Sequence, residues 1–182
     1  YMTVSTGIGG GIIVDGQIYH GSSFGAGEFG HITIDMNGPL CGCGNYGCVE
    51  AIASGPAIAR NAKEKLADHP ESLLNQYTTI TAKEVSEAAN KGDAYAKEVI
   101  ETAGSYIGAT LAGLINTFNP DLIVIGGGVS NMGELIFKPI RDEVQKRALG
   151  SFVANLEIVP AKLGGEVGVM GAIALAQSAG NV

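Results

Sequence analysis

Three cysteines lie close together in residues 27–50, which read GEFGHITIDMNGPLCGCGNYGCVE. Their spacing is Cys-x-Cys-x4-Cys at Cys41, Cys43 and Cys48, and the glycines between them permit sharp turns. Three thiolates this close can surround one ion, and a tetrahedral structural zinc site often has three cysteines and one histidine. His31, ten residues before Cys41, is the nearest nitrogen donor. We therefore expect a structural zinc site formed by His31 and the three cysteines.

Two alternatives to the metal site, and the roles of two acids, remain open. A disulfide is disfavoured because three cysteines leave one unpaired and nothing indicates an oxidising compartment. Free thiols are disfavoured because cysteine prefers burial, whereas this segment is polar and rich in glycine. Glu28 precedes His31 by three residues, and Glu50 follows Cys48 by two. A carboxylate there can balance charge, cap a helix or accept hydrogen bonds from a polyol, and the sequence alone favours the first two.

The first glycine-rich segment, residues 6–11, reads TGIGGG. It is not a Walker loop, because no Gly-Lys-Ser/Thr follows. It is not a dinucleotide fingerprint either, because Ile12 stands at the third glycine position and a strand, not a helix, is expected next. Backbone N–H groups of a hairpin here can face phosphate oxygens, with the Thr6 hydroxyl as a further donor. Spacing alone favours a tight turn over a phosphate site. The candidate phosphate ligands are Thr6, Gly7, Gly9, Gly10 and Gly11.

A second glycine segment, Gly126, Gly127 and Gly128, follows the apolar run at 122–125 and precedes an expected helix. Ligands of α/β sheets favour the carboxyl ends of strands. Glycines at that position allow a flat ring or a ribose to approach the backbone. A plain strand-to-helix turn explains the same residues equally well.

Caps, turns and hydrophobic periodicity indicate the elements that position these residues. Residues 1–21 predict a strand, a glycine turn, a second strand, an Asp15-Gly16 hairpin turn and a third strand. Further strands are expected at 122–125, buried on both faces, and at 156–159. Helices are expected at 54–67, from Thr81 for about ten residues, from the Asp93 cap to Thr117, at 134–148 and at 168–178. The pattern predicts an α/β fold whose mixed sheet begins with three antiparallel strands.

The bulk composition sets limits on the class of protein. A length of 182 residues fits one domain, 1–182, and 46% hydrophobic residues indicate a globular chain. A net charge of −7 argues against a nucleic-acid partner for this segment. No run approaches the roughly 20 apolar residues of a membrane span, and no secretory signal is evident.

Taken together, these motifs resemble the ROK family of repressors, uncharacterised reading frames and sugar kinases. The resemblance covers essentially the whole chain. It rests on STGIGGGI at 5–12, GAGEFGH at 25–31, CGCGNYGCVE at 41–50, Asn119-Pro120 and VIGGG at 124–128. It implies an actin-like ATPase lobe of the RNase H type, with flanking helices and a zinc loop. Within the family, the chain is similar to the carboxyl-terminal lobe of the bacterial glucokinases.

The resemblance also assigns roles to residues. Glu28, His31 and Glu50 would contact the sugar hydroxyls, and His31 would also ligate zinc together with Cys41, Cys43 and Cys48. Residues 6–11 would face the ATP phosphates, and Gly126, Gly127 and Gly128 the adenosine. The implied cofactors are structural Zn²⁺ and ATP with Mg²⁺, and the implied reaction is phosphorylation of a hexose, glucose first, to its 6-phosphate. The resemblance further implies a cytoplasmic homodimer or homotetramer.

Two features of the family pattern have no counterpart in this sequence. An Asp-x-Gly-Gly-Thr phosphate loop and an Asn-Asp pair, whose aspartate is the catalytic base, are both missing from residues 1–182. We expect both upstream, in an amino-terminal lobe, so the chain is expected to be an inactive fragment on its own. A sugar-sensing repressor with an upstream winged helix remains the alternative function. Glucose, N-acetylmannosamine, N-acetylglucosamine, mannose, fructose and allose all remain open as ligands.

Overall fold

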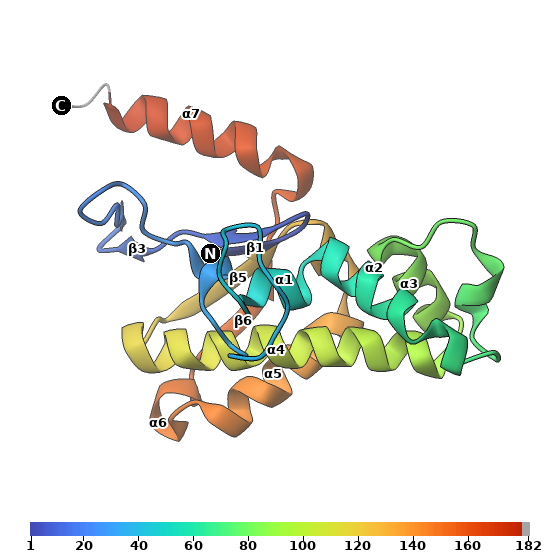
Figure 1. Ribbon diagram of the computed structural model, residues 1–182. Coiled ribbons are helices and arrows are strands. Elements are labelled where there is room, and N and C mark those ends of the chain that lie inside the picture. The colour runs from blue at the N-terminus through green and yellow to red at the C-terminus, as the bar shows by residue number, and fades with distance from the viewer. Residues whose placement is uncertain (180–182) are drawn as a thin grey trace.

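The computed structural model describes residues 1–179, so residues 180–182 of the predicted domain lie outside the described part. A four-stranded mixed sheet in the order β2-β1-β5-β6 forms its centre (Figure 1). The strands are β1 (Met2–Val4), β2 (Ile8–Gly10), β5 (Leu122–Gly126) and β6 (Glu157–Pro160). β1 pairs antiparallel with β2, whereas β1 with β5 and β5 with β6 are parallel. The predicted mixed sheet is confirmed.

A separate two-stranded hairpin follows the first antiparallel pair. β3 (Ile13–Val14) and β4 (Gln17–Ile18) are joined by Asp15 and Gly16, with φ angles of 52° and 77°. Positive φ at both central residues is the signature of a type I′ turn, so the hairpin prediction is confirmed. The third expected strand does not extend the main sheet, however. β3 and β4 pair with each other in a separate two-stranded sheet, and β1 already has β2 and β5 as its neighbours.

Two long helices pack side by side below the sheet (Figure 1). They are α4 (Ala94–Phe118), capped by Asp93 as predicted, and α5 (Glu134–Arg147). They approach closely at Gly108, which has no side chain. A Cβ there would lie only 2.6 Å from the carbonyl oxygen of Ile140. Asn119, at φ 44°, then ends α4 in the left-handed conformation that caps helices.

Burial of β5 is one-sided among the described residues. Ile123 and Ile125 are buried, whereas Leu122 is 48% exposed and Val124 is only half-buried. The prediction that this strand is buried on both faces is therefore wrong. The reason is that α4 and α5 both pack on the same side of the sheet.

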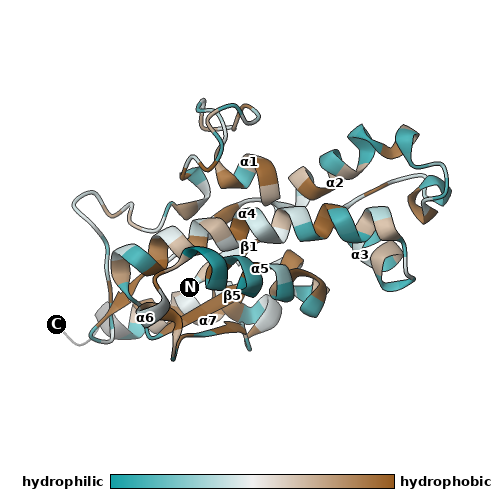
Figure 2. Ribbon diagram, turned by 90° about the horizontal axis from the view of Figure 1, so that it is seen from below, coloured by the Kyte–Doolittle hydropathy of each residue, from teal (hydrophilic) through white to brown (hydrophobic). Residues whose placement is uncertain are grey.

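The remaining helices surround the sheet and its ends, and hydrophilic residues are frequent on α2 and α3 at one end of the molecule (Figure 2). Ser54 caps α2 and a Thr81–Glu84 capping box opens α3, both as predicted, although α2 ends three residues earlier than expected. Within residues 1–179, no helix is both long and apolar enough to cross a membrane. The helices are α1 (Val49–Ala53), α2 (Gly55–Glu64), α3 (Ala82–Asn90), α6 (Gly150–Val153) and α7 (Val167–Ala179).

Candidate functional site

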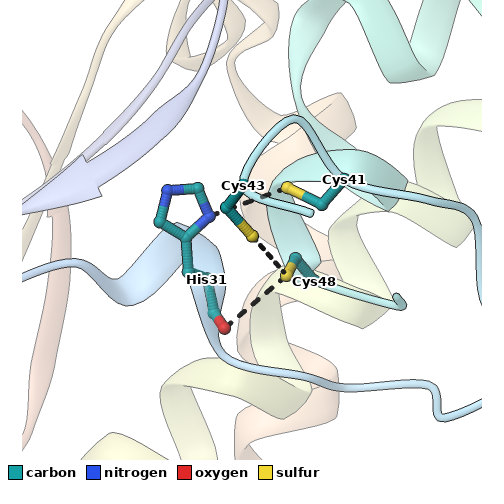
Figure 3. A group of neighbouring side chains, drawn as sticks. All are labelled: His31, Cys41, Cys43 and Cys48. Carbon is teal, nitrogen blue, oxygen red and sulfur yellow. Dashed lines mark hydrogen bonds between the residues drawn. The ribbon is translucent and has the colours of Figure 1, made fainter. Parts of the chain in front are cut away.

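The four predicted metal ligands come together in one cluster (Figure 3). Their ligand atoms, one nitrogen of His31 and the sulfurs of Cys41, Cys43 and Cys48, all lie within 4.8 Å of one another. Cys41 Sγ lies 3.7 Å from His31 Nδ1, and Cys43 Sγ lies 3.7 Å from Cys48 Sγ. None of these cysteines forms a disulfide.

These distances fit a tetrahedral zinc ion. With Zn–S near 2.3 Å and Zn–N near 2.05 Å, the edges of the tetrahedron are about 3.8 Å between sulfurs and about 3.6 Å between sulfur and nitrogen. The two observed contacts of 3.7 Å lie between these values. Cys₃His is also a standard donor set for structural zinc. The cluster can therefore close around a zinc ion if its most distant ligand atoms, within 4.8 Å of each other, approach by about 1 Å.

The surroundings of Cys48 and Cys43 shift the pKa values of their thiols, and these pKa values determine whether a proton must be lost when a metal binds. Burial, the largest cause, together with hydrogen bonds to Cys43 and Cys41 raises the pKa of the Cys48 thiol to about 12. Cys43 is exposed, and a hydrogen bond from the Asn45 backbone lowers its pKa, as do contacts with the other two thiols. Without a metal, Cys48 stays protonated at neutral pH. A metal ion must therefore displace its proton on binding.

Tight backbone packing holds the metal loop, which we define as residues 31–48. A short 3₁₀ helix, η1 (Phe29–His31), presents the histidine, and Cys48 precedes α1. Val49 N donates to the carbonyl of Ile32, so the two ends of the loop run side by side. Gly47 has φ 68°, and a Cβ there would lie 1.5 Å from the Asp35 carbonyl oxygen. Only glycine fits at that position.

The three predicted sugar-binding residues flank this cluster. His31 turns Nδ1 towards Cys41, and its Nε2 lies 3.8 Å from Glu28 Oε2. The Glu28 side chain is 70% exposed, so its carboxylate is open to a ligand. Glu50 lies in the first turn of α1 and is half-buried. Its Oε1 lies 3.9 Å from Cys41 Sγ, and its Oε2 accepts a hydrogen bond from Ile8 N at 2.8 Å.

The first glycine segment is a turn followed by a strand. β1 ends at Val4 and β2 begins at Ile8, so residues 5–7 make the turn, while Gly9 and Gly10 lie inside β2. Gly10 leaves room for the Phe29 ring, which a Cβ would meet at 2.3 Å. Gly11 N already donates to the Tyr1 carbonyl. Of this segment, Thr6 is exposed in the turn beside the large cavity described next.

A cavity of about 790 Å³ lies where the two glycine segments meet. Thr6 lines it from the first segment and Gly128 from the second. Gly127, with φ 86° and ψ 169°, places Gly128 at the start of the 3₁₀ helix η4 (Gly128–Met132). Gly126 is the last residue of β5, so this wall lies at the carboxyl end of a parallel strand. The volume suits a drug-sized ligand, typically about 300–1,000 Å³.

Part of the cavity wall has no counterpart among the residues that the sequence singled out. The first two turns of α3 contribute Lys83, Ser86 and Glu87, and the start of α2 contributes Pro56. The Thr81–Glu84 capping box located the start of α3 but gave no sign that it faces the glycine turn. This proximity comes from tertiary packing alone. The other lining residues are Ser5, Gly55, Ala59, Ile80, Thr81, Ala82, Val129, Asn131 and Met132.

Comparison with known proteins identifies relatives over nearly the whole chain. The ROK family model matches residues 1–179. A glucokinase of Halalkalibacterium halodurans is 43% identical in an alignment of 175 positions that covers 93% of this chain and 53% of that protein. The DNA-binding transcriptional dual regulator NagC of Escherichia coli is 39% identical over 160 residues, which are 88% of this chain and 39% of that protein.

Solved structures agree with the sequence comparison. The crystal structure of a ROK family glucokinase from Streptomyces griseus in complex with glucose and AMPPNP matches with a TM-score of 0.88 and 39% identity. That match covers 97% of this chain and 59% of the other. The chain thus spans between 53% and 59% of these two glucokinases.

Proposed function

This chain belongs to the ROK family, and we propose that it forms the carboxyl-terminal lobe of a kinase that phosphorylates a hexose, glucose first, with ATP and Mg²⁺. One observation carries the proposal: the glycine turn lies between the large cavity and the group formed by Glu50 and the metal cluster. On one side, Thr6 lines the large cavity. On the other, Glu50 accepts a hydrogen bond from Ile8 and lies beside the metal cluster. A two-substrate phosphoryl transfer needs two sites that adjoin in this way.

The sugar side has the chemistry for a neutral polyol. Each carboxylate can accept several O–H hydrogen bonds, and Glu28 is largely exposed. We propose that Glu28, His31 Nε2 and Glu50 bind the hexose hydroxyls. The zinc that His31, Cys41, Cys43 and Cys48 would hold is structural, since four protein ligands leave no position for water. By fixing His31 Nδ1, the metal loop would keep Nε2 turned towards the sugar.

The nucleotide side combines a glycine turn with a mostly apolar cavity. We propose that the turn formed by residues 5–7, together with the adjoining backbone of Gly9, Gly10 and Gly11, lies along the ATP phosphates. The adenosine would lie in the cavity against Gly126, Gly127 and Gly128. Mg²⁺ bound with ATP would offset the phosphate charge. A catalytic base for the sugar hydroxyl would come from residues outside this sequence, and the isolated chain would then not phosphorylate a sugar.

Assays of the full-length protein with ATP, Mg²⁺ and a panel of hexoses test the proposal. ADP release should depend on a hexose and be fastest with glucose. N-acetylmannosamine, N-acetylglucosamine, mannose, fructose and allose complete the panel. We also propose that the full-length protein is a cytoplasmic homodimer or homotetramer, and light scattering would measure its oligomeric state. No turnover with any hexose would refute the kinase proposal.

Changing Cys43 to Ser tests whether the metal site supports sugar binding. The KM for the sugar should rise, because the loss of one zinc ligand loosens the loop that holds His31. Normal sugar affinity in a metal-depleted variant would separate the two roles.

A sugar-sensing repressor is the second candidate, favoured by the similarity to NagC. The same sugars would then bind without being phosphorylated. An upstream basic helix-turn-helix would indicate this function, whereas Asp-x-Gly-Gly-Thr and Asn-Asp motifs would indicate the kinase.

A further inference from the structure

We infer that Glu50 is a positioning residue for the nucleotide as well as a sugar ligand, and that it couples the two binding sites. The inference rests on the proposed kinase function. Glu50 Oε2 accepts a hydrogen bond of 2.8 Å from Ile8 N across 42 residues of sequence. Ile8 is the first residue after the glycine turn, so this bond fixes the end of the turn.

The identity of residue 7 supports a built contact. A Cβ at Gly7 would lie 2.5 Å from Glu50 Oε2. The carboxylate therefore lies against the bare backbone of the turn, and any larger residue at position 7 would push it away. Thr6, the neighbour of Gly7, lines the proposed nucleotide cavity. We therefore expect a shift of the carboxylate to move Thr6 and with it a wall of that cavity.

Glu50 also lies directly beside the metal loop. Glu50 follows the metal ligand Cys48 by two residues, and its Oε1 lies 3.9 Å from Cys41 Sγ. The histidine side of the loop also touches β2, since a Cβ at Gly30 would lie 2.0 Å from the Ile8 carbonyl oxygen. Backbone contact through Gly30 and a side-chain hydrogen bond through Glu50 both meet at Ile8.

A carboxylate has about four lone-pair positions, so it can bind Ile8 N and a sugar hydroxyl at once. A bound sugar would restrain Glu50, and a restrained Glu50 would hold the turn in place for the phosphates. Binding of sugar should therefore strengthen binding of nucleotide, and the reverse must hold by the same factor.

Isothermal titration of the full-length protein with Mg²⁺-AMPPNP, with and without glucose, tests this inference. Without sugar, Glu50→Ala should bind AMPPNP roughly tenfold more weakly, because a hydrogen bond to a charged group is lost. Glu50→Gln should bind it within about threefold of wild type, since the carboxamide oxygen can still accept from Ile8 N. Both variants should bind glucose more weakly. Glu50→Gln should thus restore nucleotide binding but not sugar binding. General loosening of the fold would weaken both and would not produce this pattern.

Two glycine substitutions provide a matched comparison. Gly7→Ala should weaken AMPPNP binding like Glu50→Ala, because the added methyl displaces the carboxylate. Gly42→Ala, in the metal loop, has no heavy atom within 4 Å of its Cβ and should bind like wild type.

Three outcomes would overturn the inference: normal AMPPNP affinity in Glu50→Ala, equal losses in Glu50→Gln and Glu50→Ala, or no effect of glucose on the wild-type affinity. If the wild type phosphorylates glucose while any of these is seen, only the coupling is wrong. If the wild type binds neither ligand, the proposed function fails too.

Discussion

Replacing Gly127 with Ala should destabilise the protein severely, whereas the same change at Gly128 should not. The two glycines are neighbours directly after β5, so the comparison isolates backbone geometry and local packing. Gly127 has φ 86° and ψ 169°, a conformation that is essentially restricted to glycine. Gly128 shows no such positive φ.

The magnitude follows from two contributions. Holding an alanine in this region of φ and ψ costs about 1–3 kcal/mol. The new Cβ at position 127 would also lie 2.4 Å from the Val4 carbonyl oxygen and 2.8 Å from Thr3 Oγ1. Relieving that overlap means moving β1 away from β5, at a further cost of about 1–3 kcal/mol. We expect a loss of roughly 4 kcal/mol for Gly127→Ala.

At Gly128 the nearest atom to an added Cβ is Ser5 Oγ at 3.8 Å, an ordinary van der Waals distance. Gly128→Ala should therefore change the free energy of unfolding by no more than about 0.5 kcal/mol. Urea denaturation followed by circular dichroism measures both variants. If the free energies of unfolding of the two variants differ by less than about 1 kcal/mol at equal m-values, the steric reasoning is refuted, because the expected difference is much larger.

The remaining predictions concern a buried acid and the metal cluster. Burial opposes ionisation of Asp93, but hydrogen bonds from Ala96 N, the Ser72 hydroxyl and Leu73 N lower its pKa. Ionised Asp93 therefore stabilises the fold fully at pH values above its unfolded pKa of about 4. This stabilisation is lost as the pH falls through its lower folded pKa. Asp93→Asn should lower the free energy of unfolding by about 2–3 kcal/mol at pH 7. Urea denaturation should show that this difference becomes smaller in acid, and a pH-independent difference would contradict the prediction. Elemental analysis should find close to one zinc per chain, and metal-free folded protein would count against the site. Zinc affinity, measured by chelator competition, should fall as pH is lowered, because Cys48 must lose a proton to bind.

Local signals made much of the site predictable. The metal ligands lie within residues 31–48, so their short spacing favours bringing their ligand atoms close together. Helix caps at Ser54, Thr81 and Asp93 are likewise local, because each side chain bonds to a backbone N–H a few residues away. The Asp15-Gly16 turn is similar, because the pair sets its own φ angles.

Long-range packing decided the rest. Glu50 could be seen to flank the metal loop, but its hydrogen bond to Ile8 crosses 42 residues and leaves no mark in the spacing. The large cavity is assembled from four segments, around residues 5–6, 55–59, 80–87 and 128–132. The exposed Leu122 could not be foreseen either, because an apolar run looks the same whether helices cover one face of a sheet or both. Sequence determined which residues could do chemistry, since donor type and short spacing are local properties. Tertiary structure decided which of them meet, since contacts between distant segments depend on how the whole chain packs.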